Sequence, residues 1–346
     1  MSRTDDPEED PIAYFLQDIA YQGKSERTQA AYERVLRDFA RFLDDEGDNH
    51  ATAVATLAAA THRDCMAYIH SLRGTVAEST VATYASYLHR FYGYMTQVGT
   101  FDSNPMALVV EEIDESIDTD PQRREISLME MRSFLDQLTH PLDRAIVVTL
   151  LKTGIRAGEL CNLDQRDLNL TDDPRNGVTV RPQLEGRPDS LYVSATPTRG
   201  SQTNGEHRRA SNKRQRDTVI PVDSELRNVL TRWLAVRPDS ISNANPLFTG
   251  TADNWGRRIT TDMVHHTVTS HASDAGWYHD GAGAADNVTP HYFRHFFTTH
   301  LRDRTGDRGI VKYLRGDVAQ DIIDTYTHDW GSRVRDVYEQ HIYQLL

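Results

Sequence analysis

The chain has 346 residues, enough for two domains with separate cores, and a formal net charge of −13 at pH 7. Its two cysteines, Cys65 and Cys161, lie far apart in the sequence, which argues against a disulfide or cysteine-rich zinc framework and for a reducing cell interior. The first ten residues are acidic and no apolar run approaches the length of a membrane span. We therefore expect no signal peptide, no membrane partner and a cytoplasmic location.

The negative charge is unusual for a nucleic-acid-binding protein, which normally presents a basic face. Lysine supplies only four of the 38 basic residues, and aspartate outnumbers glutamate by roughly two to one. Such compositions are typical of proteins from KCl-rich cells, because the Debye length falls to about 3 Å at 1 M salt and surface self-repulsion becomes small. We expect a halophilic protein, with an ordinary acidic protein as the alternative.

The first third of the chain has helical patterns. Residues 1–10 predict a disordered acidic tail, and from Pro11 apolar residues recur at helical spacing, as Ile12, Phe15 and Ile19 do. Further helical patterns follow as far as residue 97. Residues 11–112 therefore predict a compact N-terminal bundle of four or five helices, an architecture that many small domains share.

A second domain begins after an acidic segment. Residues 113–125 predict an exposed linker, and residues 126–346 the second domain. Ser127 and Glu130 have the spacing of a capping box at its first helix. The apolar run of residues 145–151 predicts a buried helix that ends at Gly154, so that Arg156 stands between two helices.

Three strand-like segments follow, at residues 178–180, 191–193 and 218–220. The segment 196–217 between the last two is rich in cations, with only Glu206 and Asp217 as acids. It predicts a mobile basic hairpin that orders against a phosphate backbone, with a disordered surface loop as the alternative. The arginines expected to contact DNA are Arg199, Arg208, Arg209, Arg214 and Arg216.

The segment Thr289-Pro-His-Tyr-Phe-Arg-His-Phe-Phe-Thr-Thr-His-Leu301 predicts a helix with chemistry on one face. Pro290 suits the first turn, and Thr289 has a side chain that can cap it. His291 and Arg294 are three residues apart and share a face. Together they can present a proton-transfer group and a fixed cation to one phosphate.

Three motifs in order resemble the signature of the tyrosine recombinase (phage integrase) family, Arg…Lys…His-x-x-Arg…Tyr. They are Thr153-Gly-Ile-Arg-Ala-Gly-Glu-Leu160, His291-Tyr-Phe-Arg294 and Asp324-Thr-Tyr-Thr-His328. The resemblance covers the second domain closely and the first third only by general pattern. It implies a mainly α fold, with an N-terminal helical-bundle DNA-binding domain and an α+β catalytic domain that contains a small antiparallel sheet.

The resemblance also implies a role for each matched residue. Tyr326 would be the nucleophile, Arg156 and Arg294 would hold the phosphate oxygens, and His291 would transfer a proton. Lys213, which precedes the strand that ends at Pro221, would protonate the leaving oxygen. Glu159 would orient Arg156. The alternatives from the residues themselves are Tyr313 or Tyr338 as nucleophile, and Arg209 or Arg214 in place of Lys213.

One motif departs from the family. The usual Leu-Gly-His before the nucleophile is Tyr313-Leu-Arg-Gly-Asp317 here, so that Asp317 stands at the position normally held by His or Trp. A carboxylate beside a phosphate is unfavourable unless it is paired or protonated. We expect that Arg315 pairs with Asp317 or that Asp317 turns away from the phosphate.

The resulting expectation is site-specific DNA recombination through a 3′-phosphotyrosyl intermediate. The histidines of residues 262–300 lack zinc-ligand spacing, and the resemblance implies neither metal nor nucleotide cofactor. It further implies double-stranded DNA with inverted-repeat sites as partner, a monomer in solution and a tetramer on DNA. The C-terminal helix, residues 333–346, is expected to dock on a neighbouring subunit. The alternatives are a DNA-binding protein of this fold that no longer cleaves, and a type IB topoisomerase-like activity.

Overall fold

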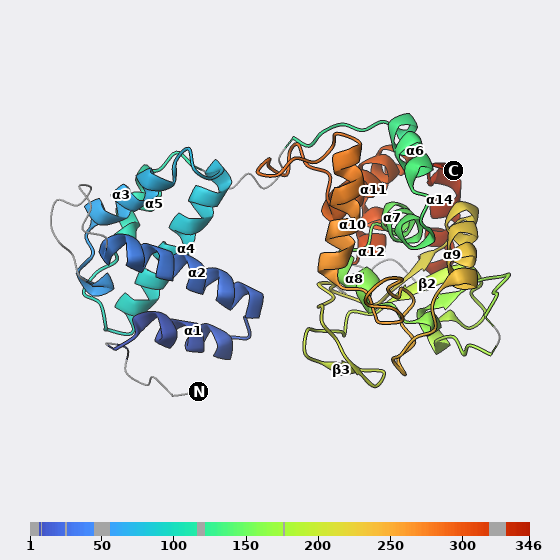
Figure 1. Ribbon diagram of the computed structural model, residues 1–346, viewed down its shortest axis with the longest axis horizontal. Coiled ribbons are helices and arrows are strands. Elements are labelled where there is room, and N and C mark those ends of the chain that lie inside the picture. The colour runs from blue at the N-terminus through green and yellow to red at the C-terminus, as the bar shows by residue number, and fades with distance from the viewer. Residues whose placement is uncertain are drawn as a thin grey trace. The chain divides into compact units, whose positions relative to one another are not determined.

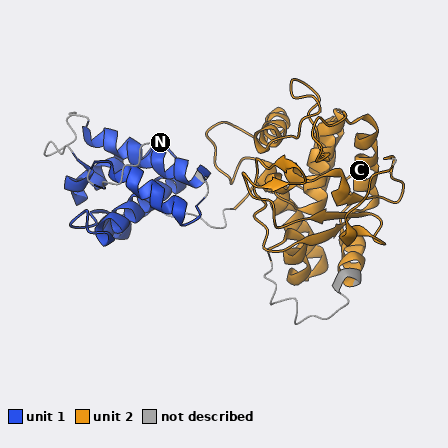
Figure 2. Cartoon of the chain, turned by 90° about the horizontal axis from the view of Figure 1, so that it is seen from below, with its two compact units in different colours: residues 1–121 blue, residues 122–346 orange. Residues whose placement is uncertain are grey.

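The structure, a computed structural model, describes residues 7, 9–24, 26–44, 56–115, 122–175, 177–317 and 330–346. The chain forms two compact units, residues 1–121 and residues 122–346 (Figure 2). The division falls within the segment predicted as a linker. Tyr326 and its motif lie outside the described residues.

Unit 1 is helical. Its elements are α1 (Pro11–Tyr21), α2 (Glu26–Asp44), the 3-10 turn η1 (Leu57–Ala59), α3 (His62–Leu72), α4 (Glu78–Gln97) and α5 (Met106–Glu112) (Figure 1). Their core is aromatic: the ring of Phe15 lies 5.4 Å from that of Tyr32 and 5.5 Å from that of Phe91, both edge-on. The predicted helical bundle is confirmed.

Unit 2 surrounds one buried helix. Its helices are α6 (Leu128–Gln137), α7 (Pro141–Thr153), α8 (Ala157–Asn162), α9 (Ser224–Val236), α10 (Thr261–Asp274), α11 (Pro290–Thr305), α12 (Arg308–Arg315) and α14 (Trp330–His341). Figure 1 shows α7 in the middle, with α9, α10 and α11 around it, and every side chain from Ala145 to Leu151 is buried. The capping box of Ser127 and Glu130 opens α6, as predicted.

The sheet of unit 2 is antiparallel, in the order β1-β2-β5. These strands are β1 (Leu168–Asn169), β2 (Ser190–Val193) and β5 (Thr218–Pro221), with the 3-10 turns η2 (Gln165–Asp167) and η3 (Pro182–Leu184) beside them. The strand predicted at residues 178–180 is wrong. The edge strand that pairs with β2 is β1, where Leu168 lies opposite Leu191. After residue 180 the chain comes back beside η2, where Arg181 N–H donates to Arg166 O.

The C-terminal helix packs on its own unit. Val334, Tyr338, Ile342 and Leu345 are buried in the core of residues 122–346. Their burial places the apolar face of α14 against its own unit, and the expectation that this helix docks on a neighbouring subunit stays a prediction.

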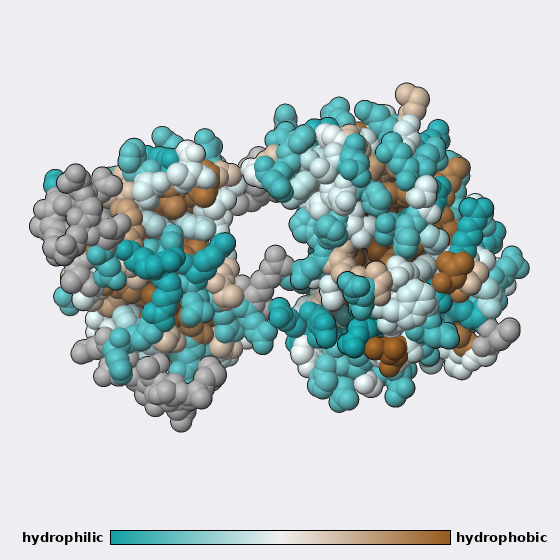
Figure 3. Space-filling view, viewed as in Figure 1, coloured by the Kyte–Doolittle hydropathy of each residue, from teal (hydrophilic) through white to brown (hydrophobic). Residues whose placement is uncertain are grey.

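Hydrophilic side chains cover most of the visible face of each unit, and apolar ones form small separate patches (Figure 3). Across the described ranges, no helix combines the length and apolar character needed to cross a lipid bilayer.

Candidate active site

Arg156 lies at the junction of two helices. Helix α7 ends at Gly154 in the left-handed region, at φ +63°, and a Cβ at this position would overlap the ring of Phe297 in α11. Two residues later Arg156 caps α8, where its backbone N–H donates to Glu159 Oε2 at 3.0 Å and its Nη1 to Glu159 Oε1 at 3.2 Å. The buried carboxylate of Glu159 therefore holds both the backbone and the side chain of Arg156.

Arg294 approaches the same junction from α11. Its side chain is almost fully buried, and its Nη1 donates to Gly154 O at 2.6 Å. Burial, together with the nearby Arg156 and Arg315, lowers the pKa of Arg294 to about 9, so the guanidinium stays charged at neutral pH. Pro290 occupies the first turn of α11 as predicted, whereas the side chain of Thr289 makes no capping hydrogen bond.

Asp317 lies between the two arginines. Its Oδ1 accepts from Arg156 Nη2 at 3.0 Å and from Arg294 Nη2 at 2.7 Å, and its Oδ2 lies 2.9 Å from Arg315 Nε. The expected pairing with Arg315 is therefore present, and Asp317 does not turn away. One carboxylate oxygen marks a point where two guanidinium groups converge on a negative charge.

His291 shares the face of α11 with Arg294 and is exposed. Desolvation and the neighbouring cations Arg123, Arg294, Arg156 and Arg315 lower the pKa of His291. The imidazole is neutral at pH 7 and can accept a proton.

Lys213 is exposed, and the backbone around it is held against α8. Asn162 Nδ2 donates to Ala210 O at 2.9 Å and to Asn212 Oδ1 at 2.8 Å. A Cβ at Gly158 would lie 2.9 Å from Ser211 O, so the chain passes close to the helix that carries Arg156. The tertiary structure thus brings the lysine segment to the arginine motif.

Arg214, the next residue, lies in the interior. Its side chain has no exposed surface, its Nη2 donates to Glu159 Oε2 at 3.2 Å, and its Nη1 donates to Leu314 O at 3.2 Å. The expectation that Arg214 contacts DNA is wrong, because this guanidinium compensates a buried carboxylate instead.

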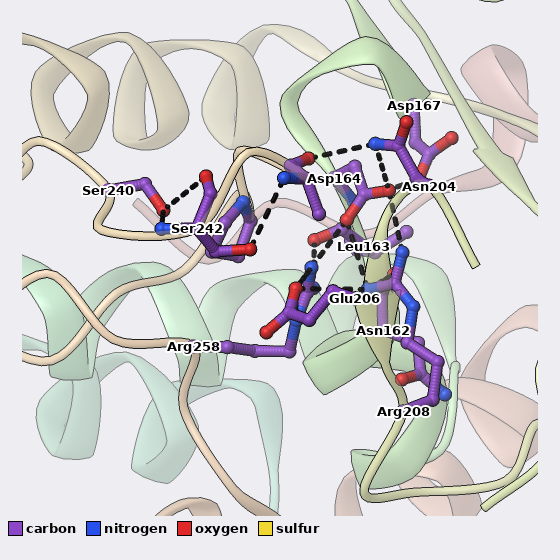
Figure 4. Close-up of polar contacts among 12 residues, drawn as sticks. Asn162, Leu163, Asp164, Asp167, Asn204, Glu206, Arg208, Ser240, Ser242 and Arg258 are labelled. Atoms are coloured by element: carbon purple, nitrogen blue, oxygen red, sulfur yellow. Dashed lines mark hydrogen bonds and ion pairs between the residues drawn. The ribbon is translucent and has the colours of Figure 1, made fainter. Parts of the chain in front are cut away.

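Arg208 is buried as well (Figure 4). It makes a bidentate pair with the fully buried Asp164, at 2.8 and 3.1 Å. Arg258 Nη2 lies 2.6 Å from Asp164 Oδ1 and 2.6 Å from Glu206 Oε2. Asn204 Nδ2 also donates to Asp164 Oδ2, at 3.0 Å. We call Asp164, Asn204, Glu206, Arg208 and Arg258 the Asp164 network.

The segment 196–217 is therefore not a free hairpin. Its strands β3 (Gln202–Thr203) and β4 (Glu206–His207) join through Asn204 and Gly205, both at positive φ, as a two-residue hairpin turn requires. The Asp164 network ties this turn to the rest of unit 2, so the prediction of a mobile hairpin that presents Arg208 to DNA is wrong. Arg199 and Arg209 are exposed, and the half-buried Arg216 stacks on Tyr313 at 4.9 Å.

The alternative nucleophiles are buried. The hydroxyl of Tyr338 donates to Lys152 O at 2.9 Å, and burial raises its pKa well above the ordinary value. Tyr313 is 7% exposed and lies beneath Arg216. Neither phenol is placed to attack a phosphate.

Arg315, expected only as a partner of Asp317, is a third cation beside Arg156 and Arg294. In the part of the chain that the structure describes, no group of three or more His, Cys, Asp or Glu side chains is arranged to hold a metal ion.

The chain matches two sequence profiles. That of the phage integrase family matches residues 126–332, and that of the phage integrase N-terminal SAM-like domain matches residues 12–98. It is 25% identical over 322 residues to the tyrosine recombinase XerC of Pelobacter propionicus, covering 91% of this chain and 89% of that protein. It is 24% identical over 337 residues to the tyrosine recombinase XerD of Shewanella oneidensis, covering 95% of each.

Solved structures share the fold. The Tn1549 transposon integrase in complex with a circular intermediate DNA matches with a TM-score of 0.63 at 18% identity, over 92% of this chain and 94% of that one. A lambda integrase dimer bound to a COC′ core site matches with a TM-score of 0.60 at 14% identity, over 88% and 93%. The first profile covers more than half of the chain, which therefore belongs to the phage integrase family. Its class of activity is site-specific DNA recombination by a tyrosine recombinase.

Proposed function

We propose that this chain breaks and rejoins DNA at specific sites through a 3′-phosphotyrosyl intermediate on Tyr326. The observation that carries the proposal is the convergence of Arg156 Nη2 and Arg294 Nη2 on a single carboxylate oxygen. Two planar cations that share one anionic oxygen suit the extra charge that develops on a phosphate during in-line displacement.

The phenolic oxygen of Tyr326 attacks the scissile phosphorus and loses its proton to His291, whose pKa is lowered so that it is neutral at pH 7. The phosphorus–oxygen bond to the 5′ side breaks, and Lys213 gives a proton to the departing oxygen. The phosphate becomes a diester between the 3′-oxygen and tyrosine. The free 5′-hydroxyl of a partner strand reverses the step and joins the exchanged ends.

The charge distribution supports DNA contact through unit 2. Residues 1–121 carry 22 acidic and 9 basic residues, whereas residues 122–346 carry 29 of each. All of the net charge of −13 therefore belongs to unit 1, and the unit with the proposed active site has none. Exposed cations of unit 2, among them Arg199, Arg209 and Lys213, are the proposed phosphate contacts.

The natural substrate that we propose is double-stranded DNA with inverted-repeat sites. The chain is a monomer in solution, and four copies assemble on the DNA. A lambda integrase tetramer bound to a Holliday junction is among the structures of similar fold, with a TM-score of 0.61 at 14% identity. We further propose that the protein works without a metal or nucleotide cofactor in a salt-rich cytoplasm. The scarcity of lysine and the acidity of unit 1 support this setting.

The first test is Tyr326→Phe on a duplex with a nick beside the cleavage point. The nick lets the short cleaved strand diffuse away, so the wild-type protein accumulates as a covalent adduct. The variant is expected to form no adduct and to bind the duplex within about threefold of wild type, since only the nucleophilic oxygen is removed. Persistent adducts would place the nucleophile elsewhere.

The same substrate separates the alternatives. The anion between Arg156 and Arg294 favours a second candidate, a DNA-binding protein of this fold that no longer cleaves. Binding of the wild-type chain without any adduct on the nicked duplex is the result expected of that candidate. Adducts accompanied by relaxation of supercoiled DNA, with no strand exchange, are expected of a topoisomerase-like enzyme.

A further inference from the structure

Asp317 and Arg315 replace a single neutral or weakly basic side chain of the family with an ion pair. The pair lies at the C-terminal end of α12, on either side of Gly316 at φ +71°. A Cβ at Gly316 would overlap the side chain of Arg214, which fixes this turn against the buried Arg214–Glu159 pair. The turn directs both Arg315 and Asp317 into the arginine cluster.

The cluster opens toward solvent on one side. The side chains of Arg156, Arg315 and Asp317 are 29%, 28% and 25% exposed, whereas that of Arg294 is 2% exposed. The two oxygens of the Asp317 carboxylate have different partners. Oδ1 accepts hydrogen bonds from Arg156 and Arg294, and Oδ2 lies 2.9 Å from Arg315 Nε. Three guanidinium groups thus surround one accessible anion.

A phosphodiester has the same acceptor pattern as this carboxylate. Each presents two oxygens that share one negative charge, and the planar fork of arginine matches both. Like-charge repulsion also makes an anion necessary here: burial and the proximity of Arg156 lower the pKa of Arg315. Without DNA, the three cations need a negative partner, and Asp317 supplies it.

We propose that Asp317 occupies the position of the scissile phosphate in the DNA-free protein, and that Arg315 is a third phosphate ligand. This inference rests on the proposed function of the site. DNA displaces the Asp317 carboxylate, and Arg315 passes from Oδ2 to a non-bridging phosphate oxygen. Arg315 is then a catalytic residue that replaces the family's His or Trp. Asp317 competes with the DNA phosphate for Arg156, Arg294 and Arg315, which we call the phosphate clamp, and so lowers their affinity for DNA.

The test of Arg315 uses charge removal on the substrate. Arg315→Ala is compared with wild type on the nicked duplex, once with a normal scissile phosphate and once with a methylphosphonate, in which a methyl group replaces one non-bridging oxygen and its charge. The expected loss of single-turnover adduct formation is about 10²–10³-fold on the phosphodiester. On the methylphosphonate, which has less charge to stabilise, the loss should fall below tenfold.

A purely structural role predicts the same loss on both substrates, and that outcome would overturn the role of Arg315. Arg308→Ala is the matched control, because Arg308 is an exposed arginine on the same helix, and it should react like wild type on both. If Arg315→Ala does not fold, Arg315→Lys keeps the charge and loses the fork. It should show a smaller loss, again reduced on the methylphosphonate.

Asp317 is tested with inorganic phosphate and no DNA. Asp317→Asn removes the competing charge, so calorimetry should show phosphate binding at least tenfold tighter than in wild type. Asp136→Asn makes the same charge change at an exposed position of α6 and should bind phosphate like wild type. Equal phosphate affinity in all three proteins would overturn the role of Asp317. Absence of wild-type adducts on the phosphodiester would instead overturn the proposed function and leave this phosphate result intact.

Discussion

Single residues in this protein connect motifs that are far apart in the sequence. Arg214 joins Glu159, which holds Arg156, to Leu314 O, and the next residue, Gln215, donates its N–H to Gly316 O at 3.0 Å. A single buried guanidinium therefore touches the arginine motif and the turn that carries Asp317, while its neighbour Lys213 remains exposed. We infer that Arg214 positions Lys213 relative to the phosphate clamp.

Arg214→Ala and Lys213→Ala should both regain adduct formation on a substrate whose leaving group needs no proton. A nicked duplex with a bridging 5′-sulfur at the scissile phosphate has a leaving group that needs no proton. Lys213→Ala should lose roughly 10²–10⁴-fold in adduct formation on the normal duplex, the range of general acid catalysis, and regain most of it on the sulfur substrate. Arg214→Ala should also be rescued, at least tenfold.

Arg156→Ala is the control for that experiment, since a lost phosphate contact is not restored by a better leaving group. If Arg214→Ala is no better on the sulfur substrate, its role is confined to supporting Glu159. If Lys213→Ala itself is not rescued, another group protonates the leaving oxygen.

Among the elements, the polar segment between β2 and β5 differs most from its prediction, because buried contacts hold it. Its turn provides Asn204, strand β4 provides Glu206, and Arg208 follows that strand. Asn204 and Arg208 contact the buried carboxylate of Asp164, and Glu206 contacts Arg258. These contacts tie the turn to the C-terminal end of α8 and to the loop around Ala244, to whose carbonyl Asn204 also donates. The segment is thus part of the fold of unit 2.

Asp164→Asn should therefore destabilise unit 2. The change leaves Arg208 in the interior without its carboxylate, and breaking a buried pair in this way costs about 3–5 kcal/mol. For a unit of this size that corresponds to a fall in melting temperature of roughly 6–20 °C. Circular dichroism melts without DNA measure it, with the exposed Asp136→Asn as the control. A shift as small as the control's would mean that the network does not contribute to stability.

In the whole molecule, charge is divided unequally between the two units. Unit 1 carries 22 acidic residues against 9 basic ones, so its surface repels itself, whereas unit 2 is balanced. Added salt shortens the Debye length from about 10 Å at 0.1 M to about 3 Å at 1 M.

The melting temperature of unit 1 is therefore expected to rise between 0.1 and 1 M KCl, and that of unit 2 to change less. Scanning calorimetry of the full chain, with the two transitions assigned by proteolysis during the melt, measures both. A fall for unit 1 over this range would contradict the assignment of the acidic composition to a salt-rich cell.

The sequence alone determined the features that depend on local chemistry. Helical periodicity predicted the bundle of unit 1 and the buried helix before Gly154, and the spacing of Ser127 and Glu130 predicted a helix start. The types and spacing of His291 and Arg294 indicated a phosphate site, and the resemblance of the Arg156 motif to the tyrosine recombinases added Arg156 to it. These features depend on residues close together in the sequence, because the sterics and hydrogen bonds that produce them act over only a few positions.

Only the tertiary structure decided which cations face solvent and which serve the interior. Arg208 and Arg214 look like Arg199 and Arg209 in the sequence, but their partners Asp164 and Glu159 lie more than 40 positions away. Asp317 likewise acquires its meaning from Arg156, 161 residues earlier in the chain. A charged side chain is defined by the charge opposite it, and for these residues folding alone brings that charge into contact.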